Sequence, residues 1–190
     1  MNMDFDRIIK ERHCVRKFRA GKKPDYKEVI AAIEAATKAP LAGNVKSIKY
    51  ILVSDKEKIK ALTVAAQQEF FENVDYVIVV CSDKTSLVRS YYKRGEIYSR
   101  QQAGASIENL FLKLTERGLA TCWVGAFSDE TVKRILKIPD NIDVEAIFPI
   151  GYELGKTKQE TKAELDNVLF FDEWKNKFMK PRRMVLGSQT

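Results

Sequence analysis

The sequence predicts one domain of mixed helix and strand, in which helices cover a central sheet. Apolar runs typical of strands alternate along the chain with segments whose apolar residues recur at helical spacing, so the class is α/β or α+β. Residues 73–83 read NVDYVIVVCSD, and such a β-branched run is typical of a strand buried on both faces. The chain has 190 residues and is 45% hydrophobic, which is enough for a substantial core.

Helices are predicted where a capping residue precedes apolar residues at helical spacing. The first follows Asp4 and runs into Arg12. Before the second, Asp25 and Glu28 match a capping box, and Pro40 enforces an end because proline disfavours helical geometry in the preceding residue. Further helices are expected over 55–71, over 99–117 with Gly118 as the stop, and over 128–138 behind a Ser128 cap.

Strands are expected over 47–54, 73–83, 119–127 and 144–152. Residues 83–97 are polar and rich in tyrosine, and their pattern indicates no particular structure. From Gly155 onward the chain is charged and irregular. It nevertheless contains large apolar side chains at Val168, Leu169, Phe170, Phe171 and Trp174. We expect a single domain, 1–190, with 156–190 as an extended C-terminal arm that another surface must cover, and a second copy of the chain is one candidate.

Charge and cysteine usage narrow the class of partner and the compartment. The formal net charge of +7 favours anionic partners: phosphate-bearing cofactors, acidic substrates or nucleic acid. The three cysteines, Cys14, Cys81 and Cys122, have neither metal-ligand nor disulfide-framework spacing, which fits a reducing compartment. The N-terminus lacks the apolar core of a signal peptide, and the apolar runs are too short to span a membrane. We expect a soluble cytoplasmic protein.

The segment RHCVRKF, residues 12–18, contains two arginines four positions apart. If the segment is extended, Arg12, Cys14 and Arg16 share one face, and if it is helical, the two arginines still share a face. Either geometry directs two guanidinium groups toward one point, and arginine forks match phosphate oxygens in pairs. The alternative is a solvated basic turn, which composition alone favours.

Three other segments have both a functional and a purely structural interpretation. Small residues in LAGN, 41–44, let the backbone approach a flat ligand, and Asn44 both donates and accepts, but an ordinary helix-to-strand turn has the same composition. Gly125, at the end of a predicted strand, indicates either a ligand edge or a bulge. Residues 88–100 interleave basic residues with tyrosines, as in some nucleic-acid binders, although a solvated connection is preferred.

The chain contains no recognisable set of catalytic side chains. It has no G-x-G-x-x-G, no Walker loop, no nucleophile motif and no zinc-ligand spacing. Its carboxylates form no readable pair for hydrolysis. His13, the only histidine, has no nucleophile motif beside it, so we give it no catalytic role. These absences favour chemistry that is supplied by a cofactor.

Taken in order, five segments make the chain resemble the FMN-dependent nitroreductase family. They are RHCVRKF, APLAGN, AAQQEFFENVDYVIVVC, AGASIENLFLKLTERGLATCWVGAF and LKIPDNIDVEAIFPIGY. The resemblance extends from about Arg12 to Trp174, and its best part is the long helix that leads through Gly118 into TCWVGAF. It implies an α+β sandwich with a central, mostly antiparallel sheet flanked by helices. It also implies a homodimer that exchanges its C-terminal arms and binds FMN at the subunit interface.

The resemblance further implies a set of cofactor-binding residues: Arg12, His13, Cys14, Arg16, Pro40, Ala42, Gly43, Asn44, Gln68, Gly125, Ala126 and Lys162. Arg12 and Arg16 would hold the FMN phosphate, or Arg16 would instead reach the ribityl chain and the N1–C2 edge of the flavin, where its charge stabilises the reduced flavin. Lys162 of the arm would join the phosphate. Cys14 stands where the family usually has serine, a better hydrogen-bond donor.

The remaining residues would surround the flavin ring. Gln68 would face the pyrimidine ring, and the backbone of Gly125 and Ala126 would meet the flavin near N5. The loop over 40–44 would reach the flavin bound mainly by the other subunit. Two departures from the family are Lys46-Ser47, where Gln-Pro is frequent, and Gln102, where an acidic residue is frequent.

The implied activity is that of an oxidoreductase that passes hydride from NAD(P)H through flavin N5 to an electron-poor acceptor such as a nitroaromatic or a quinone. The partners are then NAD(P)H, a small-molecule acceptor and a second copy of the chain, with no metal, nucleic acid or membrane. Three alternatives stay open: ene reduction, dehalogenation or flavin breakdown on the same scaffold; a flavin-binding sensor or store with little turnover; and a nucleic-acid binder that uses the basic charge.

Overall fold

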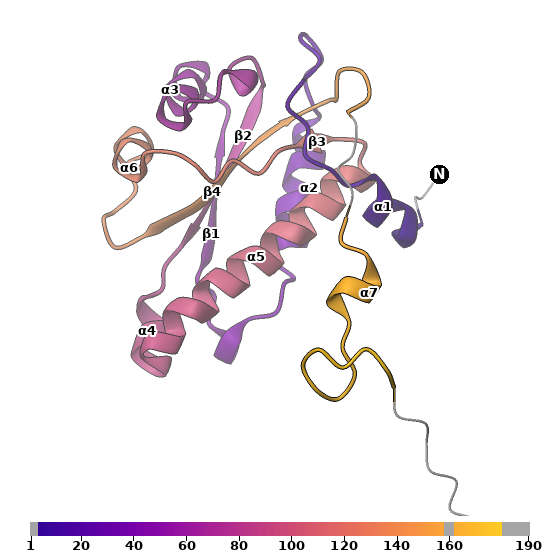
Figure 1. Ribbon diagram of the computed structural model, residues 1–190. Helices are drawn as coiled ribbons and strands as arrows, with labels where there is room; N and C mark the ends of the chain where they lie inside the picture. The colour runs from indigo at the N-terminus through magenta and orange to yellow at the C-terminus, as the bar shows by residue number, and fades with distance from the viewer. Residues whose placement is uncertain (1–3, 158–161, 180–190) are drawn as a thin grey trace, which may run out of the picture. The chain divides into compact units, whose positions relative to one another are not determined.

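Figure 1 shows the computed structural model, which describes residues 4–157 and 162–179. The chain forms two compact units, Met1–Thr157 and Lys158–Thr190, and we describe each by itself. The boundary falls next to residue 156, where the arm was expected to begin. Of the residues described, no helix combines the length and the apolar character needed to cross a membrane.

One antiparallel sheet of four strands forms the centre of the first unit. Its strands lie in the order β1 (Ile48–Val53), β2 (Tyr76–Ser82), β4 (Asp143–Gly151) and β3 (Ala120–Thr121). Every neighbouring pair in this order is antiparallel. The sheet and the helices around it establish the α+β class, and they confirm the antiparallel sheet that the resemblance implied.

Helices cover both faces of this sheet. Figure 1 shows α2 (Tyr26–Ala36) and α5 (Lys93–Glu116) on one side, with α3 (Lys56–Ala66) and α6 (Asp129–Leu136) on the other. Side chains of the two inner strands alternate between the two layers, as the pleat requires. Ile78 and Phe148 pack against α2 and α5, whereas Val79 and Ile147 pack against α3 and α6. All seven residues of β2 are buried, which confirms the strand predicted from its apolar run.

Several predicted helix ends are present. Gly118 has a φ of 67° and follows α5, and Leu119 N donates to Leu114 O at 2.8 Å, as in a Schellman motif. The Ser128 hydroxyl accepts from Thr131 N at the start of α6. Asp25 caps α2 by accepting from Lys27 N.

The expected capping box is only half correct. Asp25 provides the predicted cap at the N-terminus of α2. The Glu28 carboxylate, however, pairs with Arg117 at the end of α5, with Nε and Oε2 3.1 Å apart. The ion pair therefore joins two packed helices instead of closing the N-terminus of α2.

The helix expected over 55–71 is shorter than predicted. It ends at Ala66, because Gln67 adopts a left-handed φ of 51°, and a short 3-10 turn, η2 (Glu69–Phe71), follows. The two aromatic residues of this turn have different partners. Phe71 is completely buried in the core under α3, whereas the Phe70 ring stacks on Phe18, with centroids 6.3 Å apart. A continuous helix would not place both rings in this way.

Residues 83–97, for which no structure was predicted, form the helix α4 (Thr85–Tyr91) and the first turns of α5. The expected start of the long helix at residue 99 is therefore wrong by six residues, since α5 begins at Lys93. Leu87 of α4 is completely buried, and Tyr92 breaks the helix between α4 and α5 with a φ of 51°. Gly95 lets the two helices meet closely, because a Cβ there would overlap the Leu87 carbonyl group.

We expect Gly95→Ala to destabilise the fold markedly. The added Cβ would also lie 2.5 Å from Val88 N, and backbone cannot rotate away as a side chain can. Overpacking of this kind costs about 1–3 kcal/mol or more. Gly104→Ala in the same helix is the matched control, because a Cβ there meets nothing within 4 Å and alanine favours helix by about 1 kcal/mol. Urea unfolding measures both changes, and equal stability of the two variants would contradict the predicted clash.

Candidate functional site

The segment after α1 (Phe5–Glu11) is extended and lies beside the end of β3. Arg12 closes the helix with φ −64° and ψ 118°, and Val15 N donates to Thr121 O at 2.9 Å. Cys14 and Thr121 form a parallel bridge. Val15 is buried while Cys14 and Arg16 are exposed, so positions 12, 14 and 16 share one face. Of the two geometries considered from the sequence, the extended one is therefore present.

Arg12 is held in place by two residues of α5. Its Nε lies 3.3 Å from the Glu108 Oε1, and its guanidinium carbon lies 5.6 Å from the centroid of the Phe111 ring. The Arg12 side chain is only 18% exposed, whereas that of Glu108 is 52% exposed. The guanidinium group is thus oriented before any ligand arrives, and stacking on the ring leaves its edge available for an anion.

Cys14 forms a thiol pair with Cys122, the residue after β3. The hydrogen bond from the Cys122 thiol, a bond from the Trp123 backbone and the charges of Arg12 and Arg16 lower the pKa of Cys14 to about 5, although burial opposes them. The same partnership, together with burial, raises the pKa of Cys122. The positive charges of Arg12 and Arg16 contribute to the lowered pKa of Cys14, although less than its partnership with Cys122 does.

A strand was expected over 119–127, but only two residues, Ala120 and Thr121, form β3. Val124 then makes an isolated bridge, exchanging backbone hydrogen bonds of 3.0 Å with Ile147 in both directions. Ser128 N donates to Ala65 O at 2.9 Å. Gly125 and Ala126 are exposed between these two anchors. The strand is short because the chain leaves the ladder there and turns toward α3.

Trp123 connects this backbone to the arginines. Its ring lies 6.3 Å from the Phe111 ring, over which Arg12 is placed, and a Cβ on Gly125 would come within 3.6 Å of its Nε1. Apart from the Trp123 ring and the residues adjacent in the chain, no atom lies within 4 Å of the position that this Cβ would occupy. The structure therefore brings Arg12, Cys14 and Gly125 to one edge of the first unit.

Gln68 lies near the same edge. It is half-buried, precedes η2, and donates from its backbone N to Thr63 O at 3.0 Å. Phe70, two residues further on, stacks on Phe18, the last residue of the segment 12–18. The turn that contains Gln68 therefore packs against that segment.

The loop over 40–44 is built around a buried amide. Gln102 of α5 accepts from Ala42 N at 3.0 Å and donates to the Ser47 hydroxyl at 3.0 Å. In the 3-10 turn η1 (Ala42–Asn44), Gly43 and Asn44 both have left-handed φ angles, 56° and 58°. Gln102, where an acidic residue was expected from the family, thus supplies both a donor and an acceptor.

A pocket of about 260 Å³ opens beside this loop. The side chains and backbone that surround it are those of Pro40, Leu41, Ala42, Tyr98, Gln101, Gln102 and Ala105. Gln102 and Phe111 are nine residues apart on one straight helix, about 14 Å along its axis at 1.5 Å per residue. The 40–44 loop and the face that carries Arg12, Cys14 and Arg16, the arginine face, therefore contact α5 at different points along its length.

His13 and Lys162 have different surroundings. His13 bonds through Nδ1 to Glu11 O at 2.6 Å and through Nε2 to Glu153 Oε1 at 3.1 Å. The pKa of Glu153 is lowered because hydrogen bonds from Thr157 and His13 outweigh the opposing effect of burial. Both ring nitrogens of His13 thus have protein partners. Lys162 lies in the second unit, where its side chain is exposed.

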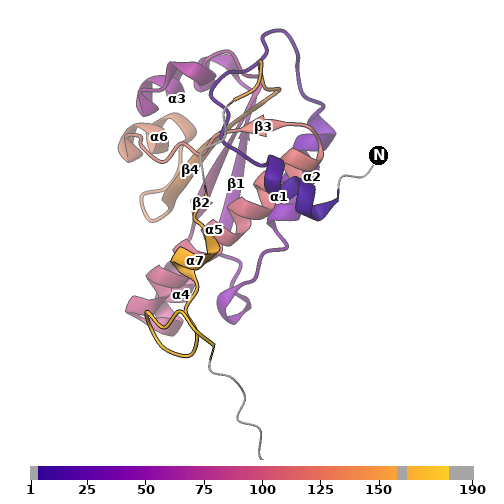
Figure 2. The same ribbon diagram turned by 45° about the vertical axis from the view of Figure 1, so that its right-hand side comes forward.

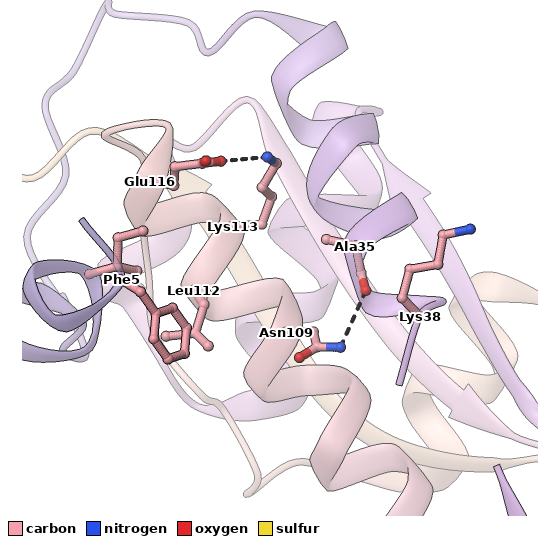
Figure 3. Close-up of a pocket in the computed structure, with 8 residues that line it drawn as sticks. Phe5, Ala35, Lys38, Asn109, Leu112, Lys113 and Glu116 are labelled. Atoms are coloured by element: carbon pink, nitrogen blue, oxygen red, sulfur yellow. Dashed lines mark hydrogen bonds and ion pairs between the residues drawn. The ribbon is translucent and has the colours of Figure 1, made fainter. Parts of the chain in front are cut away.

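Another pocket, of about 280 Å³, lies between α1, α2 and α5 (Figure 3). It is lined by Phe5, Ile8, Ala35, Lys38, Asn109, Leu112, Lys113 and Glu116. Asn109 Nδ2 bonds to Ala35 O at 3.4 Å, and the Lys113 ammonium pairs with Glu116. None of the cofactor residues expected from the sequence lines this pocket, so it is separate from the arginine face.

Four residues of the arginine face were not identified from the sequence: Glu108, Phe111, Cys122 and Trp123. Trp123 was quoted only as part of WVGAF, and Cys122 only as a scattered thiol. The contact between positions 14 and 122 depends on the bridge between Cys14 and Thr121, which no local pattern reveals. The one available signal was that Cys122 and Trp123 lie within three positions of the glycine singled out at 125.

The fold and these contacts define an α+β protein in which two arginines and an exposed glycine-containing turn lie at one edge of the first unit. A model of the Nitroreductase family matches residues 9–73 and 62–152, and the chain belongs to this family.

Three known proteins illustrate the relationship. The chain is 28% identical over 200 residues to “Putative NAD(P)H nitroreductase Spy0809” of Streptococcus pyogenes serotype M6, covering 88% of this chain and 98% of that protein. It is 24% identical over 168 residues to the iodotyrosine deiodinase of Thermotoga neapolitana, covering 80% and 89%. A solved FMN-dependent nitroreductase from Clostridium difficile R20291 superposes with a TM-score of 0.74 at 23% identity, covering 88% of this chain and 98% of that one.

Proposed function

We propose that the protein is an FMN-dependent oxidoreductase that takes hydride from NAD(P)H and reduces an electron-poor small molecule such as a nitroaromatic or a quinone. Membership of the family and the relative named as an NAD(P)H nitroreductase support oxidoreductase activity. The observation that carries the cofactor assignment is the face shared by Arg12, Cys14 and Arg16, where two guanidinium groups lie on the same side of an extended segment.

The residues present fit a flat cofactor that ends in a phosphate. Arg12 is already oriented by Glu108 and Phe111, and it would bind one side of the phosphate while Arg16 binds the other. The exposed turn at Gly125 lacks a Cβ, so a flat ring can approach its backbone. When bound, FMN would supply reversible hydride acceptance at its N5 atom. The chain would hold the reactants in position, supply positive charge near the cofactor and exclude side reactions.

We also propose that the functional unit is a homodimer. The resemblance implies that the loop over 40–44 reaches the flavin bound mainly by the second chain, and that Lys162, in the arm, completes the phosphate site. The exposed apolar side chains of the arm support the proposal, because they favour burial against another chain.

Reductive dehalogenation is the second candidate reaction. One relative is named an iodotyrosine deiodinase, and such a reaction would need the same cofactor and the same arginine face. What would differ is the acceptor. A screen of nitroaromatics, quinones and iodophenols with the reduced protein therefore decides between the two reactions by the ratio of their kcat/KM values.

The cofactor assignment is tested by identifying the flavin directly. We expect the purified or reconstituted protein to release FMN, and not FAD, on heating, because one arginine pair serves one terminal phosphate and no dinucleotide motif is present. Chromatography of the released flavin is the measurement. Anaerobic titration with NADH and NADPH, followed by flavin absorbance, then shows which nicotinamide reduces it. Release of FAD, or no flavin after reconstitution, would overturn the proposal.

A further inference from the structure

The side chain of His13 has a hydrogen-bond acceptor at each of its two ring nitrogens. Nδ1 lies 2.6 Å from Glu11 O, and Nε2 lies 3.1 Å from Glu153 Oε1. A carbonyl oxygen and a carboxylate oxygen can only accept, so both bonds form only when both ring nitrogens carry a proton. The geometry around His13 therefore matches the charged imidazolium, because a neutral ring would turn one lone pair toward an acceptor.

Glu153 is held as a carboxylate at this contact. Burial opposes its ionisation, but hydrogen bonds from Thr157 and His13 together lower the pKa of its carboxyl group. Its Oε1 accepts from Thr157 N at 2.7 Å as well as from the ring. The side chains of His13 and Glu153 are only 22% and 23% exposed, so their attraction is screened less than that of a surface pair.

This ion pair fastens the inner side of the segment 12–18 to the chain that follows β4. His13 and the buried Val15 lie on one side of the extended segment, and the two arginines lie on the other. Backbone contacts accompany the ion pair, since Leu154 N donates to Lys17 O at 2.8 Å. The position of the backbone that carries both arginines therefore depends on what His13 binds.

We propose that His13 is a positioning residue whose doubly protonated ring, bound to Glu11 O and to Glu153, holds the segment 12–18 where its two arginines bind an anion. Loss of one ring proton releases this hold. The inference rests on the anion site proposed above, and in it His13 acts through its partners without touching the anion.

The sign of the pH dependence follows from the charges around the ring. Only protonated His13 makes both bonds, so the hold is present at acid pH and fades as pH rises through the range in which histidine gives up its proton. The lower limit is the pH at which Glu153, whose pKa is lowered, takes up a proton. Two further contacts complete the charged surroundings: the Glu11 carboxylate pairs with Arg7, with Oε1 and Nε 2.7 Å apart, and Arg19 Nε donates to Glu153 O at 2.8 Å.

Glu153→Gln separates a proton switch from simple packing. The glutamine keeps an oxygen for Thr157 N, and its amide can donate to Nε2 of a neutral His13 whose Nδ1–H still bonds to Glu11 O. Because His13 is the only histidine, nitrogen NMR of the labelled, tag-free chain reads its ring directly. We expect the parent to keep the second ring proton to a higher pH than Glu153→Gln does.

The effect on the anion site is measured as FMN affinity of the full chain at pH 6 and pH 8. The FMN phosphate becomes more negative over this range, so each variant is compared with its own parent at the same pH. His13→Gln should bind FMN at least about threefold more weakly than the parent at pH 6, since a bond between charged groups is lost, and equally well at pH 8. In the Glu153→Gln background, the same change should have an effect that does not vary with pH.

The proposal is overturned if His13→Gln weakens FMN equally at both pH values, which is what a purely structural role predicts. It is also overturned if the ring of His13 titrates alike in the parent and in Glu153→Gln. Failure of the cofactor assignment looks different, because the parent then binds no FMN at either pH. Inorganic phosphate replaces FMN as the probe in that case, and a parent that binds neither has no anion site for His13 to position.

Discussion

Replacing either arginine of the shared face with alanine is expected to weaken FMN binding about ten- to hundredfold. Each charge-assisted pair with the phosphate contributes roughly 1.5–3 kcal/mol, which corresponds to that range of affinity. Arg12→Ala should have the larger effect of the two. It removes a guanidinium group that is already oriented, and it leaves the Glu108 carboxylate, 3.3 Å from the lost Nε, facing the phosphate without a counter-charge.

The structure offers variants that separate this effect from a general loss of positive charge. Arg117→Ala removes a cation that pairs with Glu28 and Glu116 at the C-terminal end of α5, so it should leave FMN affinity unchanged. Glu108→Gln keeps the shape of the side chain and an oxygen that can accept from Arg12, but it removes a negative charge near the phosphate, so it should tighten binding severalfold. Lys162→Ala should weaken FMN in the same direction as the arginine changes, but less.

Fluorescence titration of the apo-protein with FMN measures all of these affinities, since bound and free flavin differ in emission. Salt dependence is a second measurement, because a phosphate held by exposed charges should bind more weakly as ionic strength rises. If Arg12→Ala and Arg16→Ala both bind FMN as the parent does, the phosphate lies elsewhere and the arginine face has another occupant.

Sequence patterns predicted those parts of the fold that depend on local chemistry. Gly118 ends a helix because it tolerates a left-handed φ, and Ser128 starts one because its hydroxyl accepts a backbone N–H. The buried strand β2 follows from its apolar run. Each of these depends on residues a few positions apart, which is the range over which a sequence pattern carries information.

Features that depend on distant partners could not be predicted. The break at Gln67 follows from the need of Phe70 and Phe71 to reach different neighbours, Phe18 in one case and the core in the other. The start of α5 at Lys93 depends on the contact of Gly95 with α4, in a stretch whose composition favours no particular structure.

The candidate site shows the same division. Both geometries of RHCVRKF would bring the arginines together, so the sequence predicted their common face without predicting the conformation. The contacts that give this face its character come from α5 and from the turn after β3, through Glu108, Phe111 and Cys122. They are fixed by the bridge at Thr121, which only the folded chain reveals.

The second large effect is expected from removing the arm: a chain truncated before Leu165 should lack flavin or aggregate. The described part of the arm exposes large apolar side chains, namely Leu165, Val168, Trp174, Phe178 and Met179. Trp174 is 79% exposed and Phe178 80% exposed. Burying such a side chain contributes about 1.5–3 kcal/mol, so several together favour a large, obligate interface with another chain.

Folding, dimerisation and FMN binding should then be linked. If each flavin site needs the 40–44 loop of a second chain, added FMN stabilises the dimer by mass action and raises Tm, and Tm also rises with protein concentration. The truncated chain should lose both dependences. A matched variant, Trp174→Ala with Phe178→Ala in the full chain, weakens the interface without shortening the chain, and it should lower FMN affinity at micromolar concentration.

Light scattering of the holo-protein measures its oligomeric state directly, and a mass of twice the chain's 21.8 kDa is expected.

Mixing two variants that each bind flavin poorly gives a sharper test of the shared site. Arg12→Ala impairs the face that one chain contributes, and Asn44→Ala with Gln102→Leu impairs the loop that the other contributes. Because these elements lie at different parts of α5, a heterodimer of the two variants contains one intact site and one doubly impaired site. Random exchange of equal amounts makes about half of the dimers mixed, so the mixture should recover about a quarter of the parent's flavin content per subunit, whereas either variant alone should not. A stable, yellow, fully active monomer of 21.8 kDa would rule out this arrangement.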